Sequence, residues 1–455
     1  MTAAAQRALD GQRALDGHRV AAHPLSVRSA VGRAFSIARY EPQTLWEQDT
    51  ARLPRSLRRY RHRVRDFAEQ HLAPLALEAD LSPHDPSRDA ELLRVAGRAG
   101  LMTDMLPWPL GSRPAHLFRF PLQLLTCLKA EELCAACGGL GLFLCANALG
   151  VAPLLLSGKV GTIRRLLLPA HRKIARGERC LFAFAITEPA AGSDVEDTDG
   201  AEGYRPRCVA TPVSGGFRLD GTKVFISGGD LADFVLVFAA LAGEGMESWT
   251  CFCVDAKSEG FRFVRNELKM GQRASGAAEL DFEGVFVPDS HVVGELGGGW
   301  SLNRMTLNFS RMPVAAIGLG IARGAMEAAT DFACRTQLCG KPLIDYQEVQ
   351  LEVASMIAET TAMRGMIWHA ARELTPTQAM ASMTKFQCGD RAVEVCNRAM
   401  DLLGNHSVLH AHRVEKAFRD SRLNQIYEGT NQINRLAVIE DLQEHLLARV
   451  SPGDR

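Results

Sequence analysis

The segment Cys180–Asp194, CLFAFAITEPAAGSD, marks the point where the sequence changes from helical to strand-like patterns. Its first seven residues, Cys180–Ile186, are continuously apolar, which is typical of a short buried strand. More short strands are expected after it, at Val209–Ser227 (two strands around turns), Phe234–Leu241, Trp249–Val254, Phe261–Val264 and Ala278–Val287. Successive strands without intervening helices predict a β domain, and no Gly-x-Gly-x-x-Gly segment follows a strand, so a Rossmann site is not indicated.

Helical patterns flank this region on both sides. They cover residues 54–76, 89–101 and 122–178 before the strands, and 301–336, 346–373, 377–403, 412–426 and 431–448 after them. The sequence therefore predicts an α+β multidomain chain: an N-terminal helical domain (51–179), a small β-barrel-like domain (180–292) and a C-terminal helical bundle (293–455). Clefts at the junctions of such domains commonly bind ligands.

Residues 1–50 differ from the rest of the chain. The hexapeptide QRALDG occurs twice, at Gln6–Gly11 and Gln12–Gly17, and two copies are too few for a repeat array. We expect a flexible extension, and the alternative is an Arg-rich, acid-poor mitochondrial transit peptide.

Composition excludes several classes of protein. The 455 residues contain 52 Lys+Arg and 52 Asp+Glu, so the chain lacks the basic excess of a nucleic-acid binder. Its 12 cysteines lack disulfide-type spacing and indicate a reducing compartment, either the cytoplasm or, as the alternative, the mitochondrial matrix. The apolar run Gly138–Leu156 contains Asn147 and Pro153, and we expect a buried helix and no transmembrane segment. Cys134 and Cys137 have a metal-type spacing but no second Cys/His pair at zinc-site spacing, and His410 and His412 do not share a helix face, so no metal site is expected.

The segment Arg419–Arg435, RDSRLNQIYEGTNQINR, contains the best candidate for a catalytic group. A helix is expected to end near Ile426, Gly429 permits a turn, and a new helix begins near Thr430. Glu428 therefore lies at a break between helices, where it could project into a cleft. Apolar surroundings would raise its pKa and suit it to proton transfer, although the pattern alone also fits a capping or solvated glutamate.

Two motifs together resemble those of the acyl-CoA dehydrogenase family. Tyr427–Thr430, followed by Gln432 and Arg435, resembles the family's C-terminal base motif, and Ile186–Asp194 resembles its central motif. Segments Lys223–Gly228, Met270–Ser275, Phe282–Pro288 and Gly340–Gln347 also fit in order, so the similarity extends from about residue 55 to about 445. The resemblance implies FAD as cofactor and oxidation of an acyl thioester, on CoA or on a carrier protein, to the 2,3-enoyl thioester.

Residue roles follow from the same resemblance. Glu428 would take the α-proton while the β-hydrogen leaves as hydride to flavin N5, and the Glu428 amide and a flavin ribityl hydroxyl would stabilise charge on the thioester oxygen. Ser310 stands where some members carry their base, which favours Glu428. Cofactor contacts are expected from Phe184, Ile186, Thr187, Gly192, Ser193, Phe225, Ile226, Ser227, Gln347, Gly404, Thr430 and Gln432, and substrate contacts from Ser193, Asn308, Arg311 and Gly429.

The sequence departs from the family where members usually contact a neighbour's FAD across a dimer interface. Thr336 and Cys339 occupy slots for arginine and phenylalanine, with Arg335 one position early, and Met400 and Leu403 replace a glutamine and a glycine. Two hypotheses are open for the oligomer, a dimer or tetramer. Either a paralogous subunit supplies the missing groups, or Arg335 suffices in a homo-oligomer.

Other departures concern the carrier and the acceptor. Asn308 replaces an acid near the pantetheine arm, and Glu440 replaces an arginine, which could weaken contact with CoA phosphates. The expected acceptor is an electron-transferring flavoprotein or a similar partner. The alternatives are an oxidase that uses O₂, a flavin monooxygenase and a non-catalytic partner subunit. The acyl group is not predicted.

Overall fold

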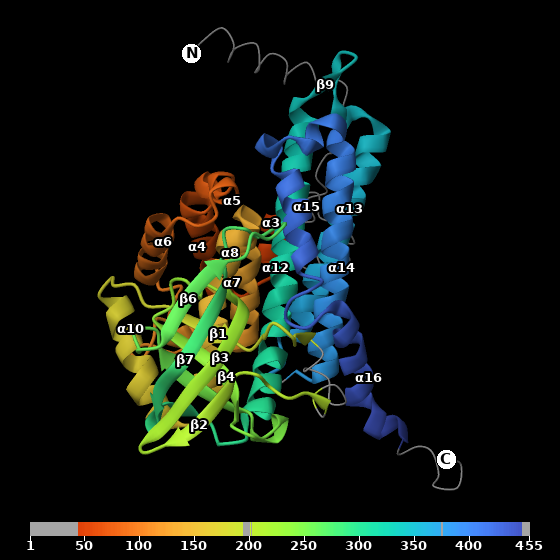
Figure 1. Ribbon diagram of the computed structural model, residues 1–455. Coiled ribbons are helices and arrows are strands. Elements are labelled where there is room, and N and C mark those ends of the chain that lie inside the picture. The colour runs from red at the N-terminus through yellow and green to blue at the C-terminus, as the bar shows by residue number, and fades with distance from the viewer. Residues whose placement is uncertain (1–43, 194–200, 202, 375, 448–455) are drawn as a thin grey trace. The chain divides into compact units, whose positions relative to one another are not determined.

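The computed structural model describes residues 44–193, 201, 203–374 and 376–447 (Figure 1). They belong to two compact units, and the division in the chain falls between Arg58 and Arg59. In the first unit, α3 (Leu45–Ala51) begins with a capping box in which Thr44 Oγ1 accepts from the Glu47 N–H at 3.2 Å. The Glu47 carboxylate accepts from the Thr44 N–H at 2.9 Å. Residues 45–50, expected to be a flexible extension, are therefore helical, and the repeated hexapeptide lies outside the described residues.

Helices precede the sheet, as predicted. They are α4 (Arg55–His71), which begins in the first unit, followed by α5 (Glu78–Leu81), α6 (Pro86–Arg98), α7 (Leu122–Ala136), α8 (Gly138–Leu156), α9 (Val160–Thr162), a π-helical turn at Ile163–Leu167 and α10 (Leu168–Ala175). By length and composition α8 could cross a membrane, but 67% of its most apolar window is buried inside the fold. It packs against α7, α12 and β1. The sequence-based interpretation of a buried core helix is confirmed.

The central domain is one eight-stranded sheet. Its strands are β1 (Phe182–Ala185), β2 (Val209–Val213), β3 (Gly216–Ser227), β4 (Phe234–Leu241), β5 (Thr250–Asp255), β6 (Phe261–Asn266), β7 (Ala277–Pro288) and β8 (Val292–Val293). The order is β6-β7-β3-β2-β4-β5-β8, and β1 pairs in parallel with β4. Inward-facing apolar side chains, among them Phe217, Phe252 and Phe282, form one buried core. The predicted β domain is confirmed.

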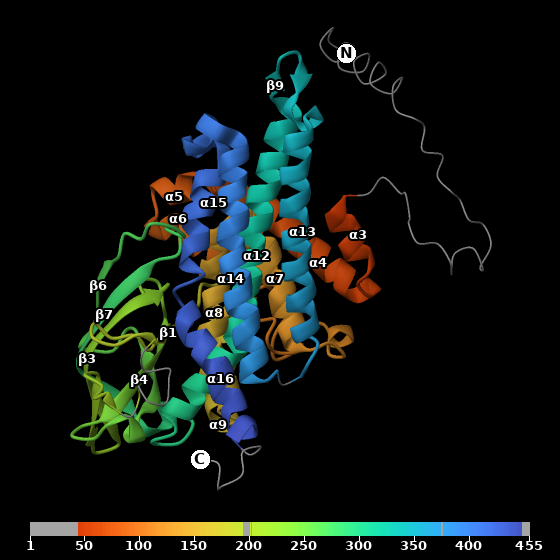
Figure 2. The ribbon, with the colours of Figure 1, turned by 90° about the vertical axis from the view of Figure 1, so that its right-hand side faces the viewer.

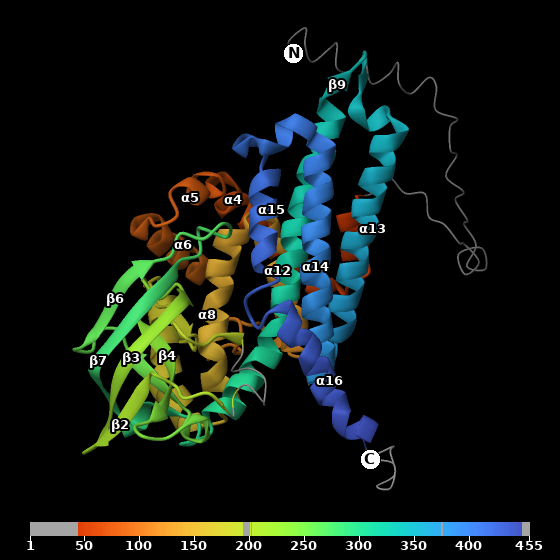
Figure 3. The same cartoon turned by 45° about the vertical axis from the view of Figure 1, so that its right-hand side comes forward.

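The C-terminal helices are α12 (Gly299–Arg335), α13 (Gln347–Ala370), α14 (Gln378–Leu403), α15 (Val414–Leu423) and α16 (Asn431–Leu447). The 37-residue α12 packs along α7, α13 and α14. Of these, α13 and α14 lie side by side with it in two views (Figures 2 and 3). A short hairpin, β9 (Gln337–Leu338) with β10 (Lys341–Pro342), joins α12 to α13. The helical predictions hold, except that α15 ends at Leu423 and not near residue 426. The boundaries at 180 and 293 stay predictions, because Arg59–Arg455 forms one compact unit.

A buried ionic cluster connects four of these helices. Glu131 and Glu132 on α7 accept hydrogen bonds from Arg61 (2.8 and 2.6 Å) and from Arg323 (3.1 and 2.7 Å). Arg364 on α13 adds a contact with Glu131 at 2.8 Å. Such charges are stable in the interior only as a group, since the loss of one partner leaves another charge without compensation.

Candidate active site

A cavity of about 560 Å³ lies between the sheet and helices α7, α8 and α12. The segment between α15 and α16 forms part of its wall. Its lining is mostly apolar and includes many of the residues predicted from sequence: Phe184, Ile186, Thr187, Gly192, Ser193, Phe225, Ile226, Ser227, Glu428, Gly429 and Thr430. Segments some 240 residues apart in the chain are thus brought to one site.

The base loop, residues 424–430, turns sharply between α15 and α16. Glu428 and Gly429 both have left-handed backbones, with φ of 56° and 76°. This conformation is unfavourable for glutamate and persists only where neighbouring contacts hold it. Here Lys385 Nζ donates to the Gly429 carbonyl at 2.6 Å, and Asn434 Nδ2 donates to the same oxygen at 2.9 Å.

The start of the base loop is held from two further directions. Asn424 Nδ2 donates to the Val314 carbonyl on α12 at 3.0 Å. The buried Gln272 side chain donates to Asn424 Oδ1 at 2.8 Å and to the Tyr427 hydroxyl at 3.3 Å. The loop is therefore fixed to α12 and to the segment before β7.

The carboxyl of Glu428 is enclosed by protein but open to the cavity. Burial raises its pKa above the ordinary value. The Ser310 hydroxyl, which donates to Glu428 Oε2 at 2.5 Å, and the charges of Arg311 and Lys385 oppose that rise. A carboxylate with a raised pKa is suited to accept a proton from carbon and to release it later.

The backbone N–H of Glu428 is a further candidate group of the site. Within the described residues no protein acceptor is in hydrogen-bonding range of this N–H. An N–H beside the base can stabilise negative charge that develops on a substrate oxygen during proton removal.

One wall of the cavity is formed by the end of β1 and an irregularity in β3. The pairing of β3 with β7 shifts between Lys223 and Ile226, and Phe225 has a φ of 59° with 59% of its side chain exposed. Such a bulge reorients one side chain. The Val224 N–H donates to the Thr187 carbonyl at 3.0 Å, which connects the two segments.

A buried ion pair supports this wall from behind. Lys223 Nζ donates to the Ile186 carbonyl and to Glu188 Oε1, both at 2.9 Å. Ser193 connects the wall to the base loop, because its Oγ accepts from the Thr430 N–H at 3.0 Å. The wall thus offers an exposed aromatic ring, apolar surface and the hydroxyls of Thr187 and Ser227. A planar heteroaromatic ring with polar edges, such as a flavin, fits these groups.

Five predicted site residues lie outside the cavity. Gln347, at the start of α13, and Gly404, at the end of α14, are exposed, as is Gln432 on the outer face of α16. Asn308 donates to the Pro376 carbonyl at 3.1 Å, and Arg311 donates to Ser382 Oγ at 2.9 Å. Neither Asn308 nor Arg311 therefore lines the cavity, and the positive charge of Arg311 opposes the rise in the pKa of Glu428.

Sequence reasoning missed several residues that organise the site. Ser310 was considered only as a position without a base, yet it is the direct partner of Glu428. Lys385, Gln272 and Asn424 were not singled out. Gln272 and Asn424 lie within the segments Met270–Ser275 and Arg419–Arg435, but a single sequence contains no signal that these two side chains and Lys385 contact the base loop.

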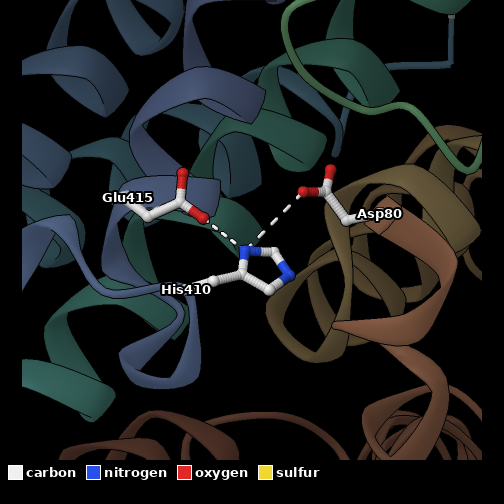
Figure 4. Close-up of side chains that lie close together, drawn as sticks. All are labelled: Asp80, His410 and Glu415. Atoms are coloured by element: carbon white, nitrogen blue, oxygen red, sulfur yellow. Dashed lines mark hydrogen bonds and ion pairs between the residues drawn. The ribbon is translucent and has the colours of Figure 1, made fainter. Parts of the chain in front are cut away.

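A separate cluster outside the cavity contains side chains of the types that can bind a metal ion. Asp80, His410 and Glu415 lie close together (Figure 4), and His410 Nδ1 is 2.5 Å from Glu415 Oε1. Arg419 already bonds both carboxylates, with contacts of 2.6 Å to Asp80 and 2.7 Å to Glu415. The guanidinium supplies the positive charge that a metal ion would bring, so we interpret the group as an ion-pair cluster between α5 and α15.

Comparison with known proteins gives one consistent result. Three family models match in order: the acyl-CoA dehydrogenase N-terminal domain at residues 55–173, the middle domain at 183–285 and the C-terminal domain at 297–443. An acyl-CoA dehydrogenase of Bacillus subtilis is 31% identical over 384 residues, 83% of this chain and 95% of the relative. The caffeyl-CoA reductase–Etf complex subunit CarC of Acetobacterium woodii is 30% identical over 381 residues, 82% and 95% of the two chains. The butyryl-CoA dehydrogenase structure from Megasphaera elsdenii matches with a TM-score of 0.76 at 29% identity, covering 87% of this chain and 99% of that one.

Proposed function

Because the chain belongs to the acyl-CoA dehydrogenase family, we propose that it removes hydrogen from the α and β carbons of an acyl-CoA, with Glu428 as the base that takes the α-proton. The family consists of oxidoreductases that act on CH–CH bonds. The observation that carries the proposal is the enclosed Glu428 carboxyl, with its raised pKa and its bond to Ser310, in a mostly apolar cavity.

FAD is the cofactor of this family, and the cavity wall suits it. Phe225 would lie against the ring system, with Thr187 and Ser227 at its polar edges and the Gly192–Ser193 backbone alongside. When bound, FAD supplies the acceptor for the β-hydrogen and its electron pair. The protein would supply the base, a mostly apolar cavity and the Glu428 N–H for the thioester oxygen.

Glu428 would act as follows. The thioester carbonyl accepts from the Glu428 N–H, which stabilises the enolate-like charge that forms as the carboxylate takes the α-proton. Ser310 keeps the carboxylate oriented and keeps its pKa from rising further. Glu428 lines the cavity with a strained, left-handed backbone, and in this proposal its amide and its carboxylate act on the same substrate.

An anaerobic absorbance titration of the FAD-loaded protein with acyl-CoAs of different lengths tests the proposal. Loss of the flavin absorbance band is expected with at least one acyl-CoA, and Glu428→Gln is expected to abolish it while still binding FAD. A Glu428→Gln protein that turns over at the wild-type rate would refute the assignment of the base and would revive the alternative of a non-catalytic partner subunit.

The proposal for the electron acceptor is based on the relatives of this chain, one of which is a subunit of a complex with Etf. We propose an electron-transferring flavoprotein as the partner of this chain. An oxidase would instead reoxidise its bleached flavin rapidly with O₂, and a flavin monooxygenase would not bleach with acyl-CoA at all. Reoxidation rates with O₂ and with electron-transferring flavoprotein therefore separate these candidates.

The proposal for the oligomer concerns one end of the molecule. There the residues expected to contact a neighbouring subunit's FAD are missing. Thr336, Cys339, Met400 and Leu403 lie around the ends of α12 and α14. Arg335, the nearest arginine, is exposed and paired with Asp331 at 2.8 Å. That surface also exposes Leu338, Val408 and Leu409, as an interface would.

We propose that a partner subunit covers this end, either a paralogue or a second copy that uses Arg335. The protein expressed alone should bind fewer than one FAD per subunit if a paralogue is needed. One FAD per subunit would rule out the need for a paralogue. A cytoplasmic location also stays a prediction, supported by the twelve cysteines, all in described segments and all free.

A further inference from the structure

We propose that the active-site cavity selects acyl groups that carry a hydroxyl remote from the thioester, which Lys129 and Thr126 would bind. This inference rests on the proposed function, since it names the substrate class of the same cavity. It starts from an unusual feature of the wall. Among mostly apolar lining residues, α7 contributes a lysine and a threonine one helical turn apart.

Lys129 is a buried cation in a cavity wall. Only 3% of the residue is exposed. Its Nζ donates to Asp104 Oδ1 at 2.6 Å and to the Leu101 carbonyl at 3.0 Å. An ammonium has three N–H donors, and within the described residues no protein acceptor is present for the third. A buried donor without a partner is unfavourable, so an oxygen acceptor in a ligand would improve this site.

Charge decides which kind of oxygen fits. Asp104 neutralises Lys129, and the carboxylate is further held by the Tyr60 hydroxyl at 3.0 Å. A substrate carboxylate would add an uncompensated negative charge to this pair, whereas a neutral hydroxyl would not. Arg113, another cation near Asp104, stacks on the Phe118 ring at 4.7 Å and does not line the cavity.

Thr126 makes a hydroxyl preferable to other neutral oxygens. Its Oγ1 donates to the carbonyls of Leu122 and Gln123, at 3.2 and 2.8 Å, which leaves oxygen lone pairs for a donor from the cavity. A substrate hydroxyl could accept from Lys129 and donate to Thr126. A ketone or an ether could make only the first of these bonds.

Lys129 and Thr126 line the same cavity as Glu428. The cations that act on the Glu428 carboxyl are Arg311 and Lys385, not Lys129. Apolar lining residues, including Leu142, Leu149, Val314 and Ile317, complete the wall. The arrangement fits an acyl group with an apolar stem and a hydroxyl beyond it.

Matched acyl-CoAs test the inference with the FAD-loaded protein. At each of several chain lengths, kcat/KM for dehydrogenation is compared among acyl groups whose distal carbon carries hydrogen, a hydroxyl or a carboxylate. The hydroxyl compound should be preferred by about tenfold or more for at least one length. Preference for the unsubstituted or the carboxylate compound at every length would overturn the proposal.

Variants of Lys129, Asp104 and Thr126 test whether these residues cause the preference for a hydroxyl. In Lys129→Met/Asp104→Asn, which removes the charged pair without leaving one charge behind, the hydroxyl-to-hydrogen ratio of kcat/KM should fall to about one. Lys159→Met/Glu295→Gln, which removes a surface ion pair, should keep the wild-type ratio. An unchanged ratio in the first variant would overturn the proposal. If that variant does not fold, Thr126→Val gives a second test, with a smaller fall in the ratio expected and an unchanged ratio again contradicting the idea.

Binding provides a readout that is independent of turnover. In a Glu428→Gln background, calorimetry should show tighter binding of the hydroxyl compound, and the difference should disappear when the Lys129 and Asp104 changes are added. Failure here is distinguishable from failure of the proposed function. If unsubstituted acyl-CoAs bleach the flavin in a Glu428-dependent way but hydroxyl compounds have no advantage, only the substrate inference is wrong.

Discussion

Replacement of Ser310 by alanine tests how the protein controls its base. The Ser310 hydroxyl donates to Glu428 Oε2 at 2.5 Å, and the carboxyl has a pKa already raised by burial. A hydrogen bond to a charged group contributes about 1.5–3 kcal/mol. Since about 1.36 kcal/mol corresponds to one pKa unit, Ser310→Ala should raise the pKa of Glu428 by about 1 to 2 units.

The sign of the effect on activity follows from the role of the carboxylate. Glu428 accepts a proton only when it is deprotonated, so kcat/KM should increase with pH through its pKa. The acidic limb of the Ser310→Ala profile should therefore move to higher pH by the same amount as the pKa, about 1 to 2 units. Well above both pKa values the variant and the wild type should converge.

The assay is kcat/KM for one good acyl-CoA substrate over about pH 5 to pH 9. Ser421→Ala is a matched control, because Ser421 is a buried serine on another helix whose hydroxyl donates to the Phe418 carbonyl at 2.8 Å. The reasoning would be refuted by an acidic limb that stays in place in Ser310→Ala, or that moves equally in the control.

Two further changes probe the scaffold around the site. Glu131→Gln leaves Arg61, Arg323 and Arg364 with too little negative charge in the interior, so urea denaturation should show a loss of about 3–5 kcal/mol in the free energy of unfolding. Lys385→Met removes a donor to the base loop carbonyl at 2.6 Å, so kcat should fall about 10- to 100-fold while FAD absorbance per protein stays unchanged.

Surface variants provide the controls for both predictions. Glu91→Gln removes an exposed partner of Arg94 and Arg98 and should change stability by less than about 1 kcal/mol. Lys257→Met should leave kcat unchanged. A Glu131→Gln protein as stable as Glu91→Gln would show that the buried cluster is not strongly coupled, and a Lys385→Met protein with normal kcat would show that other contacts hold the loop.

The sequence alone predicted the order of the elements, and its resemblance to a known family indicated Glu428 as the base, an assignment that stays a prediction. Strand and helix periodicity are local, so the change at Cys180–Ile186 and the long helical patterns after Trp300 could be read without a fold. Gly429 next to Glu428 likewise marks a local break between helices. The cavity residues at 184–193 and 225–227 were identified because they belong to contiguous motifs.

Only the tertiary structure shows what surrounds the base. Ser310 lies 118 positions before Glu428 in the sequence, and Lys385 reaches the base loop from 44 positions away. Their contacts depend on how α12, α14 and α15 pack, and helix packing is set by side chains distant in sequence. For the same reason Lys129 reads as one more polar residue of a helix until the fold places it in the cavity wall. Local sequence motifs and the family resemblance therefore predict a candidate base, whereas the groups that surround it depend on contacts between distant segments.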